Sequence, residues 1–272
     1  MTKQKTAVSG QVSKDSLGDR MKMYESVSKT VLMKRTPVII RIDGKAFHTF
    51  TKGFEKPFDS VLVEAMQRTT HYLCENIQGC VLGYTQSDEI TLVLTDYKTY
   101  TTCAWFDYEV QKLCSVAASM ATMIFNKTFS ELVDFQIFNA DSEDENMAEV
   151  IESHKAAVKK GAMFDARCFN VPLNEVTNCV LWRQQDATRN SIQSVGQHYF
   201  SHKELQNKSC DDIQEMLFVE KGVNWNMFPT HLKRGTAIVK NEQTGIWIID
   251  ENMPILTGEG RAYVESRIVF ED

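Results

Sequence analysis

Two short polar motifs in this chain each bring an aspartate to the end of a predicted strand. The first, residues 41–48 (RIDGKAFH), follows the apolar run 38–40 and contains Asp43. The second, residues 84–89 (YTQSDE), lies between two β-rich runs and places Asp88 at a predicted hairpin tip. If the two strands are neighbours in one sheet, the carboxylates of Asp43 and Asp88 can converge. Paired carboxylates suit hard cations such as Mg²⁺, and pairs of magnesium ions drive phosphoryl and nucleotidyl transfer.

Each motif has a simpler interpretation when it is taken alone. An Asp-Gly pair such as Asp43–Gly44 usually marks a turn, and residues 87–89 can be a polar hairpin tip. Together they favour a site, because each follows an apolar run and Gly44 permits a phosphate or metal to approach the backbone closely. Neighbouring residues of a strand point to opposite faces. We therefore assign Asp88 to the metals and Glu89 to a supporting catalytic role.

Cationic and hydroxyl side chains close to these aspartates are candidates for binding a triphosphate, which needs such donors as well as metals. They are Lys45, Lys56 and Ser87. Taken singly, a loop lysine is more often solvated than functional, and His48 is more often a core or surface residue than a ligand. The later pair Lys233–Arg234 predicts either a phosphate contact or an exposed turn.

The elements that must position these residues follow a recognisable order. Hydrophobic periodicity and capping residues predict a first helix from Asp15 or Ser16 to about Leu32. The pattern then predicts a strand at 38–43, a helix around 61–73, a hairpin at 80–94, a helix at 105–125 and a strand at 163–171. This order resembles a ferredoxin-like βαββαβ unit, so the expected class is α/β (α+β), with an antiparallel sheet and flanking helices.

The rest of the chain is predicted to form helices and a hairpin that pack on this unit. A helix is expected at 174–200, a second at 211–219 with Asp211 or Asp212 as its cap, and a hairpin from strands 236–240 and 246–250. The predicted organisation is a flexible tail (1–14), a catalytic domain (15–172) with a polar, partly helical insertion (130–160), and a C-terminal extension (173–272).

Composition excludes several broad classes of protein. A hydrophobic content of 43% with 24% charged residues is typical of a soluble globular chain, and we expect no membrane span and no signal peptide. The seven cysteines never form a CxxC pair, which indicates reduced thiols in a cytoplasm. A net charge of −6 argues against a broadly basic nucleic-acid surface. It leaves room for a local basic groove, because much of the acidity lies in residues 141–145.

Several motifs, taken in order, resemble the signature of the tRNA-histidine guanylyltransferase family. They are RIDGKAFH (41–48), FEKP (54–57), SDE (87–89), FDAR (164–167), WRQQD (182–186), NWN (224–226) and KRG (233–235). The match extends from about Met21 to Gly235. The resemblance implies a polymerase-like palm domain, two Mg²⁺ ions, ATP and GTP as substrates, and nucleotide addition in the 3′-to-5′ direction. It also implies a homotetramer that binds tRNA across its subunits.

One departure from the family pattern distinguishes between its branches. Eukaryotic-type members carry His-Ile-Asn-Asn after the Trp-Arg…Asp motif, whereas residues 188–191 here read TRNS, with Thr188 in place of the histidine. The chain therefore resembles the bacterial-type like-protein branch. Members of that branch repair truncated tRNA 5′ ends by template-directed addition.

The resemblance also implies roles for particular residues. ATP first activates the tRNA 5′-monophosphate, and the 3′-hydroxyl of an incoming nucleotide then attacks, with Asp43, Asp88 and the Gly44 carbonyl holding the metals. The expected nucleotide-binding residues are Lys45, Ala46, Phe47, His48, Lys56, Asp59 and Ser87. The expected RNA or nucleotide contacts are Arg167, Arg183, Arg189, Asn190, Lys233 and Arg234.

Three alternatives stay open at this point. The enzyme can add guanosine strictly to histidine tRNA. It can be a nucleotide cyclase that uses the same palm and metal pair, in which case ATP or GTP alone yields a cyclic product. It can also be a non-catalytic RNA-binding protein, a reading that the intact pair Asp43 and Asp88 opposes.

Overall fold

The computed structural model describes residues 16–140, 145–241 and 243–270. The chain separates into two units, residues 1–30 and 31–272. The first unit contains α1 (Leu17–Ser26), whose N-cap Ser16 accepts a hydrogen bond from the Asp19 N–H at 3.0 Å. The cap prediction is confirmed, but α1 ends six residues before the predicted Leu32. All of its residues are exposed, so packing does not extend the helix through the Ser- and Val-containing residues that follow. The predicted tail, 1–14, lies outside the described residues.

The second unit is built on one six-stranded sheet in the order β4-β1-β3-β2-β5-β6, with every neighbouring pair antiparallel. The strands are β1 (Val38–Gly44), β2 (Cys80–Gln86), β3 (Glu89–Leu94), β4 (Phe164–Asn170), β5 (Thr236–Lys240) and β6 (Trp247–Asp250). The first four carry the ferredoxin-like βαββαβ order that the sequence predicts, which confirms the mixed α/β class. Strand β5 pairs with β2, so residues beyond 172 continue the same sheet.

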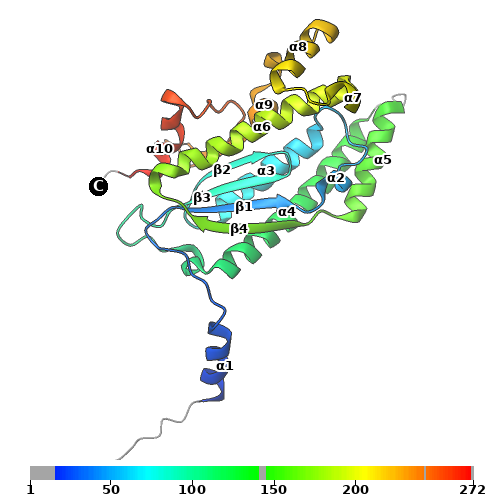
Figure 1. Cartoon of the computed structure of the whole chain (residues 1–272). Coiled ribbons are helices and arrows are strands. Elements are labelled where there is room, and N and C mark those ends of the chain that lie inside the picture. The colour runs from blue at the N-terminus through cyan, green and yellow to red at the C-terminus, as the bar shows by residue number, and fades with distance from the viewer. Residues whose placement is uncertain (1–15, 141–144, 242, 271–272) are drawn as a thin grey trace, which may run out of the picture. The chain divides into compact units, whose positions relative to one another are not determined.

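Helices cover both faces of this sheet (Figure 1). On one face lie α3 (Ser60–Asn76) and α4 (Val110–Asn139), and on the other α6 (Val176–Tyr199) and α10 (Ala262–Ile268). Val38, Ile40 and Ile42 of β1 join the first core, and Ile39 joins the second. Because β1 is buried on both faces, its sequence is a continuous apolar run rather than an alternating one.

The predicted boundaries of two further helices, α4 and α8, are also wrong. Helix α4 continues to Asn139 rather than ending near Phe125, because its buried stripe extends through Phe129 and Val133. A 3₁₀ turn, Trp105–Tyr108, precedes it. Helix α8 (Cys210–Lys221) is capped by Ser209 rather than Asp211 or Asp212. Asp212 instead reaches back to the Ser209 N–H, which completes a capping box.

Within the region 130–160, every described residue except Ala140 is helical, in the end of α4 or in α5 (Glu145–Lys160). The remaining short elements are α2 (Phe47–Phe50), α7 (His202–Leu205), α9 (Thr230–Arg234) and the 3₁₀ turns Leu173–Glu175, Trp225–Met227 and Gly258–Arg261. In the described part of the chain, no helix combines the length and hydrophobicity that crossing a bilayer requires.

Candidate active site

The end of β1 and the tip of the β2–β3 hairpin lie side by side. Asp43 pairs in register with Glu89 across β1 and β3, and the Gly44 N–H donates to the Asp88 carbonyl at 3.1 Å. Asp43 also stands opposite Asp165 of β4. The two motifs that are separate in the sequence therefore meet at one end of the sheet.

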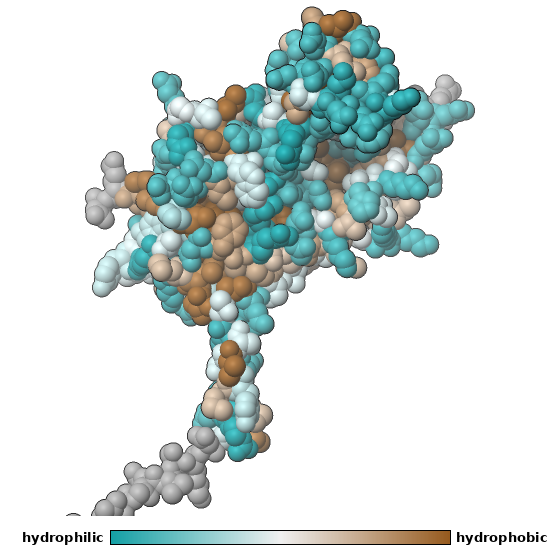
Figure 2. All heavy atoms as spheres, in the orientation of Figure 1, coloured by the Kyte–Doolittle hydropathy of each residue, from teal (hydrophilic) through white to brown (hydrophobic). Residues whose placement is uncertain are grey.

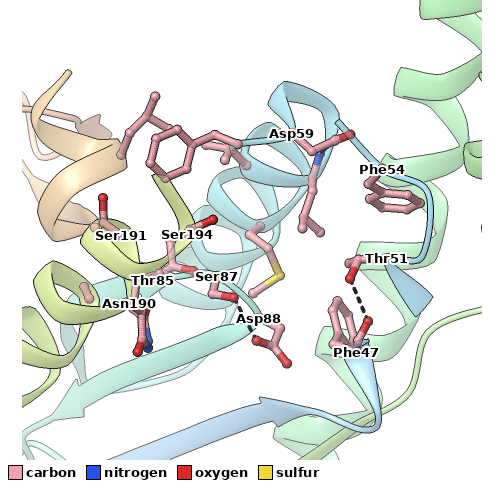
Figure 3. A pocket seen from close by; sticks show the side chains of 18 of the residues that line it. Phe47, Thr51, Phe54, Asp59, Thr85, Ser87, Asp88, Asn190, Ser191 and Ser194 are labelled. Carbon is pink, nitrogen blue, oxygen red and sulfur yellow. Dashed lines mark hydrogen bonds between the residues drawn. The ribbon is translucent and has the colours of Figure 1, made fainter. Parts of the chain in front are cut away.

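A cavity of about 580 Å³ opens at this point. Its wall includes residues from β1, α2, the loop 54–59, α3, the hairpin tip, α6 and α9. Figure 3 shows Asp88 and Ser87 on one side of the cavity, Phe47 and Thr51 on another, and Asn190, Ser191 and Ser194 of α6 across from them. In the space-filling view, hydrophilic side chains cover much of α8, and hydrophobic side chains show in the recess between it and α5 (Figure 2).

The turn from β1 into α2 depends on a glycine. A Cβ atom added to Gly44 would lie 2.2 Å from Cδ2 of Phe47, so another residue would displace that ring. The Phe47 ring packs against Phe125 and Phe164 at centroid distances of 5.6 and 5.2 Å. Ala46, which lies between Gly44 and Phe47 in the sequence, has a φ of 53°. The side chain of Phe47 is buried in the core. Gly44 and Ala46 have little or no side chain, so their backbone can line the cavity wall.

Two carboxylates at this end of the sheet are poorly neutralised. Burial raises the pKa of Asp88, hydrogen bonding with Ser87 partly opposes this, and the charges of Asp43 and Glu89 raise it further. Burial also raises the pKa of Asp43, together with the charges of Glu89 and Asp165, against a smaller opposing effect of Arg167. The ionised forms of both groups are thus disfavoured until a cation joins them.

Glu89 is in a different electrostatic situation although it adjoins Asp88 in the sequence. Its carboxylate accepts from Arg41 at 3.2 Å and from Arg183 at 2.9 Å. The Gln86 side chain donates to it at 2.9 Å. Glu89 is therefore held by cations of the protein itself, on the sheet face that α6 covers.

The donors at this site fit Mg²⁺ only as an incomplete set. Among the described residues, no group of three or more His, Cys, Asp or Glu side chains is arranged to hold a metal ion alone. Magnesium is commonly bound through one or two carboxylates while substrate phosphates and water supply the other oxygens. Asp43, Asp88 and the Gly44 carbonyl match that pattern. The protein groups around the two acids do not offset the effect of burial, so the pKa of each stays raised.

The predicted nucleotide-binding residues are only partly gathered at the cavity. The wall includes Ala46, Phe47, His48, Lys56, Asp59 and Ser87. Within the described part of the chain the wall does not include Asp43 or Lys45, which flank Gly44. The Asp59 carboxylate is engaged by protein groups: it caps α3 through the Leu62 N–H at 2.9 Å and accepts from the Glu55 N–H at 3.0 Å.

The residues predicted to contact RNA or nucleotide divide into exposed and buried sets. Arg167, Arg189 and Asn190 are exposed, and Asn190 lines the cavity. Arg183 is buried and paired with Glu89 and Asp186. Lys233 is buried as well.

The Lys233 ammonium donates to the Asn226 carbonyl at 2.6 Å, above the Trp225 ring. Arg234 is half-buried, and its carbonyl accepts from the Tyr84 hydroxyl at 2.6 Å. The side chains of Arg183 and Lys233 thus hold the protein together and are not available to a phosphate in this structure.

Several cavity residues of α6 and α9 are not among the site residues predicted from the sequence. They include Ala187, Ser191, Ser194, His231 and Leu232. The α6 residues recur at spacings of three and four, which places them on one helical face together with Asn190. That spacing was visible in the sequence, but it became informative only once α6 was known to cross this end of the sheet.

Comparisons with known proteins point to one family. A family model described as tRNAHis guanylyltransferase matches residues 18–172. A solved bacterial tRNA(His) guanylyltransferase (Thg1)-like protein in complex with ATP is 43% identical, with a TM-score of 0.81 over 94% of this chain and 100% of that one. A corresponding complex with GTP is 39% identical, with a TM-score of 0.75 over the same shares. The tRNA(His) guanylyltransferase of Saccharomyces cerevisiae is 25% identical over 77% of this chain and 85% of its own length.

Proposed function

The chain belongs to the tRNAHis guanylyltransferase family of nucleotidyltransferases, and on that premise we propose that it repairs the 5′ ends of tRNA by template-directed 3′-to-5′ nucleotide addition. In this reaction ATP activates the 5′-monophosphate of the tRNA. This activation joins AMP to the 5′-phosphate and releases pyrophosphate. The 3′-hydroxyl of an incoming nucleotide then attacks the activated phosphate, and AMP leaves. The solved relatives bound to ATP and GTP support the choice of nucleotides.

The observation that carries this proposal is the under-neutralised pair of carboxylates beside a nucleotide-sized cavity. Asp43 and Asp88 would hold two Mg²⁺ ions with the Gly44 carbonyl, which the raised pKa values of both acids support. Bound Mg²⁺ lowers the pKa of an attacking hydroxyl and neutralises the charge of a departing phosphate. Glu89 would act in support, because its pairing with Arg41 and Arg183 fixes the hairpin that carries Asp88.

The cavity wall supplies groups that can orient a triphosphate. Lys56 and His48 are exposed at the wall, and Ser87 presents a hydroxyl next to Asp88. We propose that Lys56 neutralises phosphate charge and that the backbone from Gly44 to His48 lies along the chain of phosphates. A volume of about 580 Å³ falls within the range of roughly 300–1,000 Å³ of small-molecule and cofactor sites.

Selection of the added base is proposed to come from pairing with the opposite tRNA strand. The Thr188 hydroxyl donates to the Gln184 carbonyl at 3.0 Å within α6, so it is already engaged inside the helix. An enzyme that adds guanosine without a pairing partner needs protein groups that read the base. At this position the chain has a threonine whose hydroxyl is hydrogen-bonded to the backbone of its own helix and does not read a base.

The test is nucleotide incorporation into tRNAs that lack their first nucleotide, with each of the four bases opposite the gap in turn. We expect the added base to follow the template and truncated tRNAs to be better substrates than full-length histidine tRNA. Guanosine addition regardless of the opposing base, with a preference for intact histidine tRNA, would refute the repair assignment. A cyclic product from ATP or GTP alone would indicate a cyclase.

We further propose that the protein acts in the cytoplasm as a homotetramer that binds tRNA across its subunits. Neighbouring large apolar side chains exposed on one helix support assembly, because contiguous exposed apolar surface marks interaction sites. They include Phe135 and Phe138 of α4, which are 67% and 86% exposed. Light scattering of the purified protein should give about four times the chain mass of 31.1 kDa, and a monomer would oppose the proposal.

A further inference from the structure

A fully buried histidine lies behind the nucleotide cavity, on a helix that supplies none of the described cavity wall. His154 of α5 is 0% exposed. Its Nε2 atom lies 2.9 Å from Oδ2 of Asp59, and its Nδ1 atom lies 2.7 Å from Oε1 of Gln136 in α4. The ring also makes edge contacts with Phe54 and Phe129 at centroid distances of 4.4 and 5.6 Å.

Both hydrogen-bond partners of this ring are oxygen atoms as the side chains are placed. An ionised carboxylate and an amide oxygen can only accept hydrogen bonds, and a histidine whose two nitrogens both donate is an imidazolium. The assignment of the Gln136 amide agrees, because its Nε2 atom is directed at the Met147 sulfur at 3.5 Å. With these partners, the 2.9 Å contact between His154 and Asp59 fits a buried ion pair.

The Asp59 carboxylate in turn closes the loop that carries Lys56. Oδ2 accepts from the Glu55 N–H at 3.0 Å, and Oδ1 accepts from the Leu62 N–H at 2.9 Å. One carboxylate thus ties together the start of the loop, the first turn of α3 and the histidine of α5. The middle of the loop is held from α6, where the Ser194 hydroxyl donates to the Pro57 carbonyl at 2.9 Å.

The entry to the loop is fixed by the same histidine. Phe54 is 4% exposed and stacks on Phe129 with an interplanar angle of 10°. The His154 ring meets both rings edge-on, at 87° and 83°. Since residues 54 and 59 are both held by His154, the four residues between them are left with little freedom, although Lys56 itself is exposed to the cavity.

We propose that His154 is a positioning residue for nucleotide binding: its imidazolium holds the Asp59 carboxylate and, through it, fixes the loop that presents Lys56 to the triphosphate. The inference rests on the proposed function and deepens it, because it assigns to α5 a role in preparing the triphosphate site. Removing the ring leaves the Asp59 carboxylate buried without its cation, a condition that proteins relieve by moving the group or protonating it. Either response releases the Glu55 N–H and loosens the loop.

The test combines an ATP-binding cycle with a readout that needs no nucleotide. ATP affinity with Mg²⁺ is measured by calorimetry for the wild type and for H154L, K56A and the double variant. We expect H154L and K56A each to weaken ATP binding by about tenfold, the effect of losing one charge-assisted contact. The double variant should lose little more than either single one, because both changes act through the same contact.

Hydrogen exchange of residues 55–62 is measured in parallel, without ATP. We expect faster exchange in H154L and a smaller increase in H154Q, because a glutamine amide can still donate to Asp59 but brings no charge. H154Q also serves if H154L does not fold. The matched control is H202L, which removes an exposed histidine in α7 and should change neither readout.

Two results would overturn the inference: additive losses in the double variant, or unchanged exchange at residues 55–62 in both His154 variants. Nitrogen chemical shifts of His154 that show one unprotonated ring nitrogen would overturn the ion pair. Failure of the proposed function would look different. In that case the exchange pattern and the imidazolium persist, but ATP does not bind the wild type, or addition survives the loss of Asp43 and Asp88.

Discussion

Asp88 and Asp59 line the same cavity, and burial acts to raise the pKa of both carboxyl groups. The net pKa shifts are nevertheless opposite. At Asp59, hydrogen bonds from His154, Leu62 and Glu55 together with the histidine charge outweigh burial, so its pKa falls below the ordinary value. At Asp88 the hydrogen bond from Ser87 is insufficient, and nearby acids add to the effect of burial, so its pKa rises. The difference is one of partners rather than of depth.

This contrast separates acids that hold the fold from acids that await a ligand. A structural carboxylate is matched by cations and donors of the protein, as Asp59 is by His154 and as Glu89 is by two arginines. A carboxylate left without such partners destabilises the folded protein, and a bound cation removes that cost. The same sheet end contains both kinds, one residue apart at Asp88 and Glu89.

The largest predicted effect tests the unpaired acid of this comparison, Asp88, through the rate of nucleotide addition. In D88N, and likewise in D43N, we expect nucleotide addition to fall about a thousandfold or more, since several kcal/mol of transition-state stabilisation by the metals is lost. The fold should remain intact. Single-turnover incorporation with labelled nucleotide and thermal unfolding measure the two properties. Activity within about tenfold of the wild type in either variant would contradict the metal assignment.

The second prediction tests the paired side of the comparison at Arg183. Its side chain is 4% exposed and pairs with both Glu89 and Asp186. R183L removes the buried cation that Glu89 and Asp186 share and leaves them only Arg41 and the exposed Arg189. We expect the free energy of unfolding to fall by about 3 kcal/mol in urea titrations.

The control for that experiment is R189L. Arg189 pairs with the same Asp186 but is 66% exposed, so its loss should cost less than about 1 kcal/mol. Equal stabilities for the two variants would show that burial does not set the strength of these pairs.

Most of the fold could be predicted from the sequence, because the hydrophobic pattern and turn residues of most elements are clear locally. The apolar run 38–40 and the two β-rich runs of the hairpin define strands whose pairing brings Asp43 and Asp88 together. The end of α4 was missed because the polar residues of 130–139 mask a buried stripe that continues through Val133. The cap of α8 was missed because Asp211, Asp212 and Ser209 all suit such a position, and only the backbone geometry selects the serine.

The site was less predictable than the fold, because side-chain partners depend on elements far apart in the chain. The sequence motifs predict that Arg183 and Lys233 contact RNA or nucleotide, as exposed cations would. Both side chains are buried in the structure. A motif records that a residue matters and leaves open whether it contacts substrate or supports the fold. The pairing of Asp59 with His154 joins positions 95 residues apart, and no local pattern predicts it.

The third prediction uses pH to separate Asp59 from Asp88. The lowered pKa of Asp59 means that its ionised form stabilises the fold, so D59N should be less stable than the wild type at neutral pH, by about 2 kcal/mol. That gap should close as pH falls through the lowered pKa. The raised pKa of Asp88 has the opposite sign, so without Mg²⁺ D88N should equal or exceed the wild type at neutral pH. Its gap should close at a higher pH.

Chemical unfolding of both variants between pH 7 and pH 3 measures the two curves. Added Mg²⁺ should stabilise the wild type but not D88N, since a cation that binds only the folded state shifts the equilibrium. Parallel curves for D59N and D88N would show that the two acids do not differ in their partners.

The smallest expected effect concerns tRNA binding by cations on α6 and near α9. Arg189 is exposed and directly precedes Asn190 at the cavity wall, so an RNA end that enters the cavity passes close to it. Lys233 is buried against Asn226, and burial followed by the charge of Arg234 lowers its pKa. We therefore expect R189A to weaken tRNA binding a few-fold and to reduce the salt dependence by about one phosphate contact.

The matched variant K233M should leave the slope of log affinity against log salt unchanged, because a buried ammonium releases no counterion from the RNA. It should instead lower the unfolding temperature through the lost hydrogen bond to Asn226. Filter binding at several salt concentrations gives the slopes. A reduced slope for K233M with a normal slope for R189A would reverse the assignment, and would mean that α9 opens when tRNA binds.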